Sequence, residues 1–561
     1  MSAIPVDLSP PLLSLVDQLL AEQQALSAVE VFSRRQDEGI MGPDRKRYEE
    51  RISFDASALR PGQQLAFQVD LDACTGCKAC VTACHSMNGL AEEETWREVG
   101  LAVGEGGVQQ TLTTACHHCE DPACLSGCPV MAYEKDPVTG IVRHLDDQCI
   151  GCQYCILKCP YDVPKFNAEL KIVRKCDMCT GRLAAGESPA CVQACPTGAI
   201  SITIVDRVAP ESVPPLIAGL SESMPDSSIT RPTTRYLSQR KIATLKPADW
   251  DRVRPAPAHD PLAVMLVLLQ LSVGALAVGS FASLAGLLTD SALSLVFVSA
   301  AFTALLGLAA ATLHLGRPSY AFRAFLGWRT SWMSREIIVV GAYAPIVAIL
   351  AIASSIIQLG GVPGLESSLP LRLVVAALSP LQVLALVTGA IGIGCSMMIY
   401  TDTRRLAWGW RRTGPLFLGT LGTLGALAVA VASVLDVVFS GEGDVVLALP
   451  FFVLGLSMLA AKCWIERKWI TTKRAAVNQS PALMRGARLM HGALRTRARF
   501  RLALAAVSLL GGFVAISVMP QMDTGVAIGL SVGVLLFATL GEFVERHLYF
   551  TSEASPSMPG H

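Results

Sequence analysis

Residues 149–160 read CIGCQYCILKCP, and the chemistry of a whole domain can be inferred from them. Cys149, Cys152 and Cys155 are each separated by two residues, and Cys159 follows three residues later, directly before a proline. A tight loop with this spacing can hold three thiolates against one small object, while the fourth cysteine points away and serves another. The stretch therefore indicates an iron–sulfur domain with more than one cubane cluster.

Three further groups of cysteines vary the same pattern. Of the 18 cysteines in the chain, 16 fall in these four groups, and at four thiolates per cluster they predict four [4Fe–4S] clusters with none left over. The expected iron ligands are Cys74, Cys77, Cys80, Cys84, Cys116, Cys119, Cys124, Cys128, Cys149, Cys152, Cys155, Cys159, Cys176, Cys179, Cys191 and Cys195.

Zinc and disulfide bonds are the alternative uses of these cysteines. Zinc sites use paired Cys-x2-Cys motifs but rarely add a third cysteine two residues on and a fourth before a proline. Thiols stay reduced in the cytoplasm, which disfavours disulfides if the domain lies there. Cys395 and Cys463 lie in apolar stretches and are expected to be inert packing residues.

The composition divides the chain into a cysteine-rich half and an apolar half. Hydrophobic residues make up 52% and charged residues 16%, and the formal net charge of zero gives no sign of a nucleic-acid partner. Crossing a bilayer takes about 20 residues of helix, and eight apolar segments reach or approach that length. They are residues 262–288, 291–313, 335–359, 371–400, 415–439, 444–464, 501–519 and 524–545.

The predicted fold is an α+β, ferredoxin-like four-cluster domain followed by an all-α, eight-helix transmembrane bundle. The N-terminal part shows apolar residues at helical spacing, which fits either a helix packed on its own domain or a docking helix for a partner. The first 30 residues show no signal-peptide pattern. The expected parts are an N-terminal helical extension (1–65), the cysteine domain (66–206), a Pro-rich connection (207–260), the membrane anchor (261–550) and a disordered tail (551–561).

Basic residues predict the orientation of the bundle. Three of the loops expected between the helices, together with the helix ends that flank them, hold 19 Lys and Arg, whereas the other four loops hold essentially one, Arg372. The positive-inside rule puts the three basic loops in the cytoplasm. Eight crossings return the chain to its starting side, so the cysteine domain and both termini are expected on the cytoplasmic side of a bacterial inner membrane.

The four cysteine groups resemble the four-cluster subunit of the dimethyl sulfoxide reductase family of molybdoenzymes, and the eight apolar segments resemble the membrane anchor of the same enzymes. The fusion of both in one chain departs from the family's usual separate subunits. The resemblance implies that motifs exchange their fourth cysteines, and that the set with Cys159 lies nearest the quinone. The implied sets are Cys74, Cys77, Cys80 with Cys195; Cys176, Cys179, Cys191 with Cys84; Cys149, Cys152, Cys155 with Cys128; and Cys116, Cys119, Cys124 with Cys159.

The resemblance also implies a quinone site near His314 and Glu336. The segments HLGRP (314–318) and SWMSRE (331–336) are similar to the family's quinol-site region, and the histidine and glutamate keep its spacing. The family's basic residue two places after the proline is Tyr320 here, and Arg323 is the candidate to replace it. Oxidation of quinol releases protons as well as electrons, and a histidine and a carboxylate suit their removal. No histidine pair suits a bis-histidine haem, so a haem-free anchor is expected.

These features predict a redox subunit that oxidises quinol from the membrane pool and passes electrons to a separate molybdopterin catalytic subunit. Quinol oxidation would be the only reaction that this chain itself carries out, so whether the chain alone is an enzyme stays open. One alternative runs the same path in reverse for a dehydrogenase. Another makes the membrane half a proton-translocating module, for which Asp436 and Glu542 are the few ionisable candidates. Neither the final substrate nor the direction of electron flow can be inferred from the sequence.

Overall fold

In the computed structural model the chain forms two units, each described by itself. The smaller joins Met1–Ala58 to Cys179–Pro189, and the larger holds Leu59–Met178 and Ala190–His561. The residues described are Leu15–Ala25, Glu30, Arg34 and 59–558, apart from 105–106, 208–216, 218–223, 240–244, 359–368, 441–443, 476–480 and 555–557.

The smaller unit contains the helix expected in the N-terminal extension. Helix α1 (Leu15–Ala25) exposes Leu15, Val16, Leu19 and Leu20, each by half or more of its surface. The apolar residues 12 and 13, which continue the helical spacing in the sequence, lie outside the described residues. A docking role for α1 stays a prediction. The second described helix of this unit is α7 (Thr180–Ala184).

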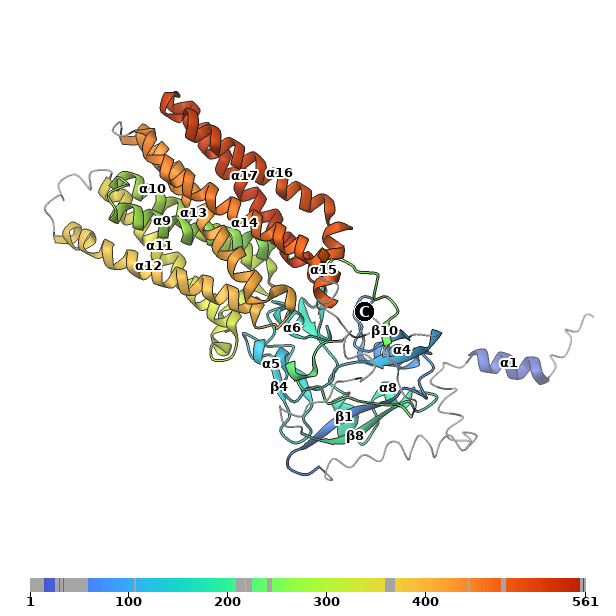
Figure 1. The fold of residues 1–561 in the computed structure, drawn as a ribbon. Coiled ribbons are helices and arrows are strands. Elements are labelled where there is room, and N and C mark those ends of the chain that lie inside the picture. Colours follow the sequence, from blue (N-terminus) through green and yellow to red (C-terminus); the bar gives the residue numbers. More distant parts are fainter. Residues whose placement is uncertain are drawn as a thin grey trace, which may run out of the picture. The chain divides into compact units, whose positions relative to one another are not determined.

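Two small sheets and two hairpins form the framework of the cysteine domain in the larger unit (Figure 1). In the first sheet, β1 (Gln63–Asp70) pairs antiparallel with β8 (Ile200–Asp206) and parallel with β9 (Arg235–Leu237). The remaining strands are β2 (Glu98–Gly104), β3 (Gln109–Thr114) and β10 (Leu245–Pro247) in the second sheet, and the hairpins β4 (Tyr133–Lys135) with β5 (Val142–His144) and β6 (Lys165–Asn167) with β7 (Ile172–Arg174).

Strands β9 and β10 come from the Pro-rich connection. Each pairs with a strand of the cysteine domain, β9 with β1 and β10 with β2. The boundary expected at residue 206 therefore cuts through the domain, because short strands from the following segment complete both sheets.

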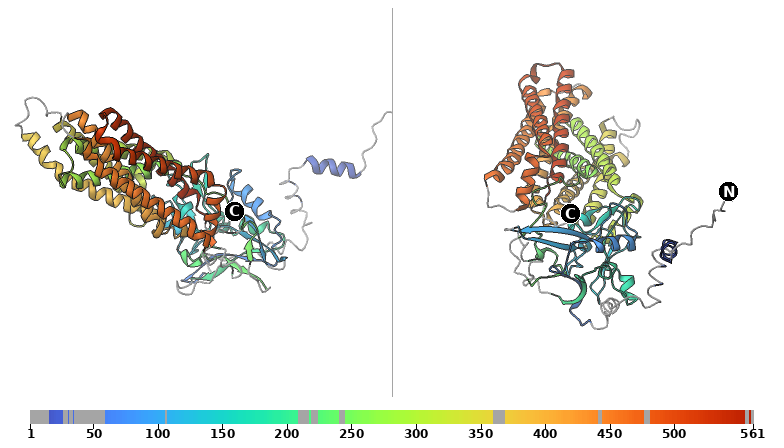
Figure 2. Two further views of the ribbon diagram at one scale, coloured as in Figure 1. Left: turned by 45° about the horizontal axis from the view of Figure 1, so that its top comes forward. Right: turned by 90° about the vertical axis from the view of Figure 1, so that its right-hand side faces the viewer.

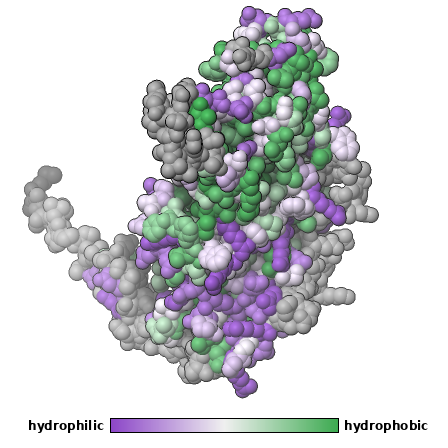
Figure 3. All heavy atoms as spheres, turned by 90° about the vertical axis from the view of Figure 1, so that its left-hand side faces the viewer, coloured by the Kyte–Doolittle hydropathy of each residue, from purple (hydrophilic) through white to green (hydrophobic). Residues whose placement is uncertain are grey.

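Eight helices of the larger unit are long and apolar enough to cross a membrane, by length and composition. They run side by side in one bundle (Figures 1 and 2), with the short helix α15 (Pro481–His491) before the seventh. Hydrophobic side chains dominate the surface over the helices, and hydrophilic ones the surface over the cysteine domain (Figure 3). The eight are α9 (Asp260–Leu284), α10 (Asp290–His314), α11 (Trp332–Gln358), α12 (Leu369–Thr401), α13 (Trp410–Ser440), α14 (Leu449–Ala475), α16 (Arg495–Val518) and α17 (Thr524–Thr551).

Small residues bring two of these helices into close contact. Gly274 of α9 and Gly425 of α13 pack backbone against backbone, with no room for a Cβ atom on either. Small residues at helix interfaces are how membrane helices gain packing energy in the absence of a hydrophobic driving force.

The expectation of a disordered tail from residue 551 is wrong for the tail residues that the structure describes. Ser552, Glu553, Ala554 and Met558 are all at least nine-tenths buried. Glu553 forms an ion pair with Arg405, which explains why the end of α17 is held in place.

Buried charges inside the bundle are more numerous than expected. Glu542 accepts hydrogen bonds from Lys462 and from Arg501, the latter at 2.9 Å, and α17 continues nine residues beyond it instead of ending nearby. Three cations thus face three carboxylates. This group, called the ion network below, consists of Lys462, Glu466, Arg501, Glu542, Glu545 and Arg546.

Candidate functional site

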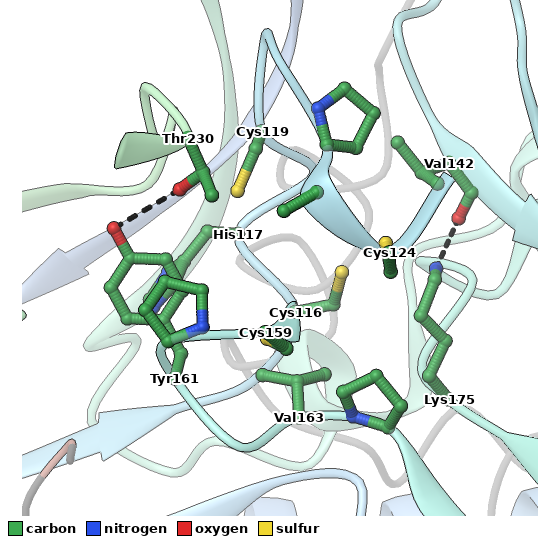
Figure 4. Close-up of a pocket in the computed structure, with 14 residues that line it drawn as sticks. Cys116, His117, Cys119, Cys124, Val142, Cys159, Tyr161, Val163, Lys175 and Thr230 are labelled. Carbon is green, nitrogen blue, oxygen red and sulfur yellow. Dashed lines mark hydrogen bonds between the residues drawn. The ribbon is translucent and has the colours of Figure 1, made fainter. Parts of the chain in front are cut away.

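One cavity in the cysteine domain is lined by Cys116, Cys119, Cys124 and Cys159, a set implied by the family resemblance. The four sulfur atoms point toward its centre (Figure 4). The cavity has a volume of about 370 Å³, and its other walls are mostly apolar, including Val142 and Val163. The sequence motifs therefore bring four thiols together around one mostly apolar cavity.

Left-handed backbone conformations explain how the Cys-x2-Cys-x2-Cys loops fold. In the loop from Cys149, the residues directly before and after the middle cysteine, Gly151 and Gln153, have φ of 68° and 59°. In the loop from Cys74 the corresponding residues, Gly76 and Lys78, have φ of 73° and 61°. Two such residues curl the backbone, which turns successive cysteines toward one point before a short helix begins.

Two further cavities gather two more of the implied sets. One, of about 280 Å³, is lined by Cys128, Cys149, Cys152 and Cys155. Another, of about 290 Å³, is lined by Cys74, Cys77, Cys80 and Cys195. In both cases the fourth cysteine comes from a different motif, so the exchange of fourth cysteines agrees with the geometry.

The remaining set is divided between the two units. Cys84, Cys176 and Cys191 are buried in the larger unit. Burial, and next the proximity of Cys84, raises the pKa of the Cys176 thiol well above its ordinary value. Cys179 belongs to the smaller unit, where it precedes α7.

The cavities suit iron–sulfur clusters in two respects. Burial raises the pKa of Cys128 and of Cys159 to about 11, so free thiols there stay neutral, whereas coordination by a metal deprotonates a thiol outright. Backbone N–H groups of Ala132 and Gly151 donate to the sulfurs of Cys128 and Cys149 at 3.2 and 3.4 Å, and hydrogen bonds of this kind tune cluster potentials. Among the described residues, no group of three or more His, Cys, Asp or Glu side chains lies close enough together to hold a single metal ion.

The cavity of Cys128, Cys149, Cys152 and Cys155 adjoins the membrane helices. All four of these cysteines belong to the same hydrophobic core as residues of α9 to α13. Gly327 donates to the Pro129 carbonyl at 2.8 Å, and Arg317 donates to the Ile150 carbonyl at 3.0 Å. The loop after α10 thus packs on the segments around Cys128 and Cys152, while Cys124 packs against the same core and Arg405 of the bundle donates to the Cys159 carbonyl. That the set with Cys159 lies nearest the quinone stays a prediction.

His314, at the end of α10, lies beside this cavity. Its imidazole interacts with the backbone of Cys152. Its ring also meets that of His259 edge to face, with centroids 5.3 Å apart. His259 in turn contacts the ring of Phe550. The expected quinone-site histidine thus lies between the cysteine cavity and the end of the helical bundle.

The other two quinone-site candidates have separate partners. Glu336 of α11 is 6% exposed and accepts a hydrogen bond from Ser396 of α12. Arg323 donates to the Asp147 carbonyl, and its guanidinium lies 4.4 Å from the Tyr320 ring. Among the described residues no hydrogen bond joins His314, Glu336 and Arg323 to one another. Arg323 acts as a link between the loop and the cysteine domain.

Sequence reasoning missed His259, Arg405 and Lys158. Arg405 donates to the carbonyls of Leu157 and Cys159, at 3.0 and 3.3 Å. Lys158 pairs with Asp402 at 2.6 Å. Arg405 was counted only as a loop charge, and no motif marks His259 or Lys158, because their partners lie far away in the sequence.

Comparison with known proteins agrees with this geometry. The model of a 4Fe-4S dicluster domain matches residues 108–205. The B subunit of the anaerobic dimethyl sulfoxide reductase of Haemophilus influenzae is 34% identical over 199 residues, which cover 33% of the present sequence and 85% of that subunit. This protein belongs to the family of dimethyl sulfoxide reductase iron–sulfur subunits.

Formate dehydrogenase subunits are related as well. The nitrate-inducible formate dehydrogenase iron–sulfur subunit of Escherichia coli is 36% identical over 156 residues, covering 24% of the present sequence and 53% of that protein. The dimethyl sulfoxide reductase family assignment makes the cysteine domain an iron–sulfur, electron-transfer module. Its eight apolar helices fit a fused membrane anchor.

Proposed function

We propose that this chain is the electron-transfer and membrane-anchor subunit of a molybdopterin oxidoreductase, and that it passes electrons from membrane quinol to a separate catalytic subunit. The sixteen cysteines would hold four [4Fe–4S] clusters, which supply one-electron transfer when bound. Three of the four proposed ligand sets line one cavity each, which supports the assignment.

The observation that carries this proposal is the shared core between a cysteine cavity and the membrane helices. Cys128, Cys149, Cys152 and Cys155 pack in one hydrophobic cluster with residues of α9 to α13. A redox centre there lies next to the bilayer, where quinol dissolves. A route for electrons from quinol to the cysteine domain then needs no further protein.

Quinol becomes quinone by giving up two electrons and two protons, so the site must accept protons. His314 is half-buried beside the Cys152 backbone, and a neutral imidazole can accept a proton as a general base. Glu336 is a buried carboxylate that only Ser396 engages among the described residues, and ionisable groups at membrane depth are functional by default. We assign proton acceptance to these two side chains.

The proposed setting is the bacterial inner membrane, with the cysteine domain on the cytoplasmic side. Basic residues from the three loops counted above contact the cysteine domain or the connection, as Arg317, Arg405 and Arg488 do. The positive-inside rule then favours the cytoplasm for this end of the bundle. The catalytic partner is expected on the same side.

Iron analysis and paramagnetic resonance of the anaerobically purified complex test the proposal. We expect about 16 iron atoms per chain, four for each cluster, and cluster signals that appear when a quinol analogue is added. Zinc in place of iron would overturn the redox assignment. Iron clusters that dithionite reduces and quinol does not would overturn quinol oxidation.

The similarity to formate dehydrogenase subunits favours one second candidate, the same path run in reverse. A dehydrogenase partner would then reduce the clusters, and quinone would take up the electrons together with two protons. The two directions are distinguished by comparing two rates, that of quinol reducing the oxidised clusters and that of a quinone analogue reoxidising clusters reduced with dithionite. Only the second candidate predicts that the reoxidation is the faster of the two.

A further inference from the structure

Arg97 is a buried cation that neither the expected ligand sets nor the quinone site explains. It is 2% exposed and precedes β2. Its guanidinium lies 4.5 Å from the Phe67 ring, and NH1 donates to the Thr113 hydroxyl at 3.2 Å. Its NH2 group is buried and has no hydrogen-bond partner, and no carboxylate pairs with Arg97 among the described residues.

The neighbours of Arg97 are cysteines from two different sets. Cys80 belongs to the cavity of Cys74, Cys77, Cys80 and Cys195, and its sulfur lies 3.6 Å from the same Thr113 hydroxyl that Arg97 binds. Cys191, Cys176 and Cys84 of the divided set are also close enough to interact electrostatically with the guanidinium. Arg97 thus lies in the gap between two proposed clusters.

A buried guanidinium without a carboxylate is costly, because burial of an unpaired charge carries a penalty of several kcal/mol. An arginine cannot escape the penalty by losing its proton. The thiolates of two clusters would supply the missing negative charge, and a cluster sulfur would supply the acceptor that NH2 lacks.

We propose that Arg97 raises the reduction potentials of the two clusters that flank it, by its fixed positive charge and by a hydrogen bond from NH2. Adding an electron makes a cluster more negative, and a nearby cation stabilises the reduced form more than the oxidised form. Net charge and hydrogen bonds to sulfur are among the factors that set cluster potentials. This inference rests on the proposed four-cluster assignment.

A second cation lies in the next gap along the domain. Lys175 is 3% exposed and donates to the carbonyls of Val142 and Cys176, the latter at 2.9 Å. It also borders the cavity of Cys116 and Cys124 (Figure 4). It therefore neighbours a different pair of proposed clusters from Arg97, and it offers an internal comparison.

The test is a redox titration of the purified complex, followed by paramagnetic resonance. In an Arg97→Met variant we expect two cluster signals to move to lower potential and the other two to stay. In Arg97→Lys, which keeps the charge but not the fork of donors, the same two signals should move less. Lys175→Met should move a pair that shares one member with the Arg97 pair. Arg143→Gln is the control, because Arg143 is exposed and pairs with Glu134.

Unchanged potentials in Arg97→Met, or equal shifts of all four signals, would overturn the inference. If Arg97→Met does not retain iron, the Arg97→Lys variant decides. Unchanged cluster potentials in Arg97→Lys would overturn the role of the donor fork. Loss of iron in Arg97→Lys as well would make Arg97 a folding residue and overturn the inference. Iron content and quinol reduction of the unmodified complex report on the proposed function separately, so the two failures are distinguishable.

Discussion

Gly316 packs directly against the carbonyl oxygen of Lys171, with no space for a Cβ atom between them. Gly316 also donates to the Gly151 carbonyl at 3.4 Å. This contact holds the loop after His314 on the backbone between Cys149 and Cys152. The glycine is needed here for close approach, and the junction between the membrane helices and the cysteine domain depends on it.

A Gly316→Ala substitution should therefore loosen the junction without emptying the cavities. Overpacking of this kind costs about 1–3 kcal/mol, so we expect a lower unfolding temperature and slower reduction of the clusters by quinol, with iron content unchanged. Stopped-flow absorbance gives the rate. Gly341→Ala is the matched control, because nothing lies near its Cβ position, and equal behaviour of the two variants would contradict the account.

Removing one carboxylate from the ion network should destabilise the bundle. Glu542→Gln leaves Lys462 and Arg501 buried with one negative charge fewer, and breaking a buried pair on one side costs about 3–5 kcal/mol. We expect a clear fall in the unfolding temperature in detergent. The double variant Lys462→Met, Glu542→Leu should recover part of the loss, since it leaves fewer unpaired charges.

Retained stability of Glu542→Gln would instead indicate that the carboxylate is already neutral or hydrated. A network that stabilises helix packing does not by itself translocate protons. Proton uptake by vesicles that contain the Glu542→Gln complex should therefore equal that of the unmodified complex per electron transferred. A lower ratio would favour the proton-translocating alternative.

Patterns within one segment predicted most of the fold. The eight apolar runs correspond to α9–α14, α16 and α17, because helix length and apolar composition are local properties. Partners from distant segments could not be predicted in this way. Nothing near Lys462 in the sequence identifies Glu542 as its partner, and the strand β10 was hidden in a Pro-rich stretch.

The candidate site divides in the same manner. Cysteine spacing identified the sixteen thiols, and the resemblance supplied sets that agree with three cavities. The position of His259 against His314 needed the structure, since the two meet only because the end of α10 returns to the start of α9. Which set lies nearest the quinone stays a prediction, because motif spacing says nothing about which loop packs on the helices.

Substitutions at the quinone-site candidates should separate proton acceptors from docking contacts. General base catalysis is worth about 10²- to 10⁴-fold, so His314→Gln should slow quinol oxidation by at least 100-fold, and Glu336→Gln by a similar factor. Arg323→Gln should lose less than 10-fold, because Arg323 binds the Asp147 carbonyl. Steady-state rates with a quinol analogue provide the measurement, and an Arg323 effect as large as that of His314 would contradict this division.

The membrane orientation has its own test. A phosphatase that is active only in the periplasm, fused after His561, should be inactive, and a cytoplasmic reporter at the same place should be active. Arg317 and Arg405 also bind the cysteine domain, so their presence in these loops does not depend on membrane orientation alone. The reporter result is therefore a stronger test of the orientation than the count of basic residues. Phosphatase activity would place the cysteine domain in the periplasm.

We expect electrons to enter from quinol through the cavity of Cys128, Cys149, Cys152 and Cys155. A Cys152→Ser complex, purified anaerobically, tests it most directly by paramagnetic resonance, with Cys395→Ser in α12 as the control. We expect that dithionite still reduces the three other clusters of Cys152→Ser and that quinol no longer reduces them. Cys395→Ser should behave as the unmodified complex. Full reduction of those three clusters by quinol in the Cys152→Ser complex would contradict it.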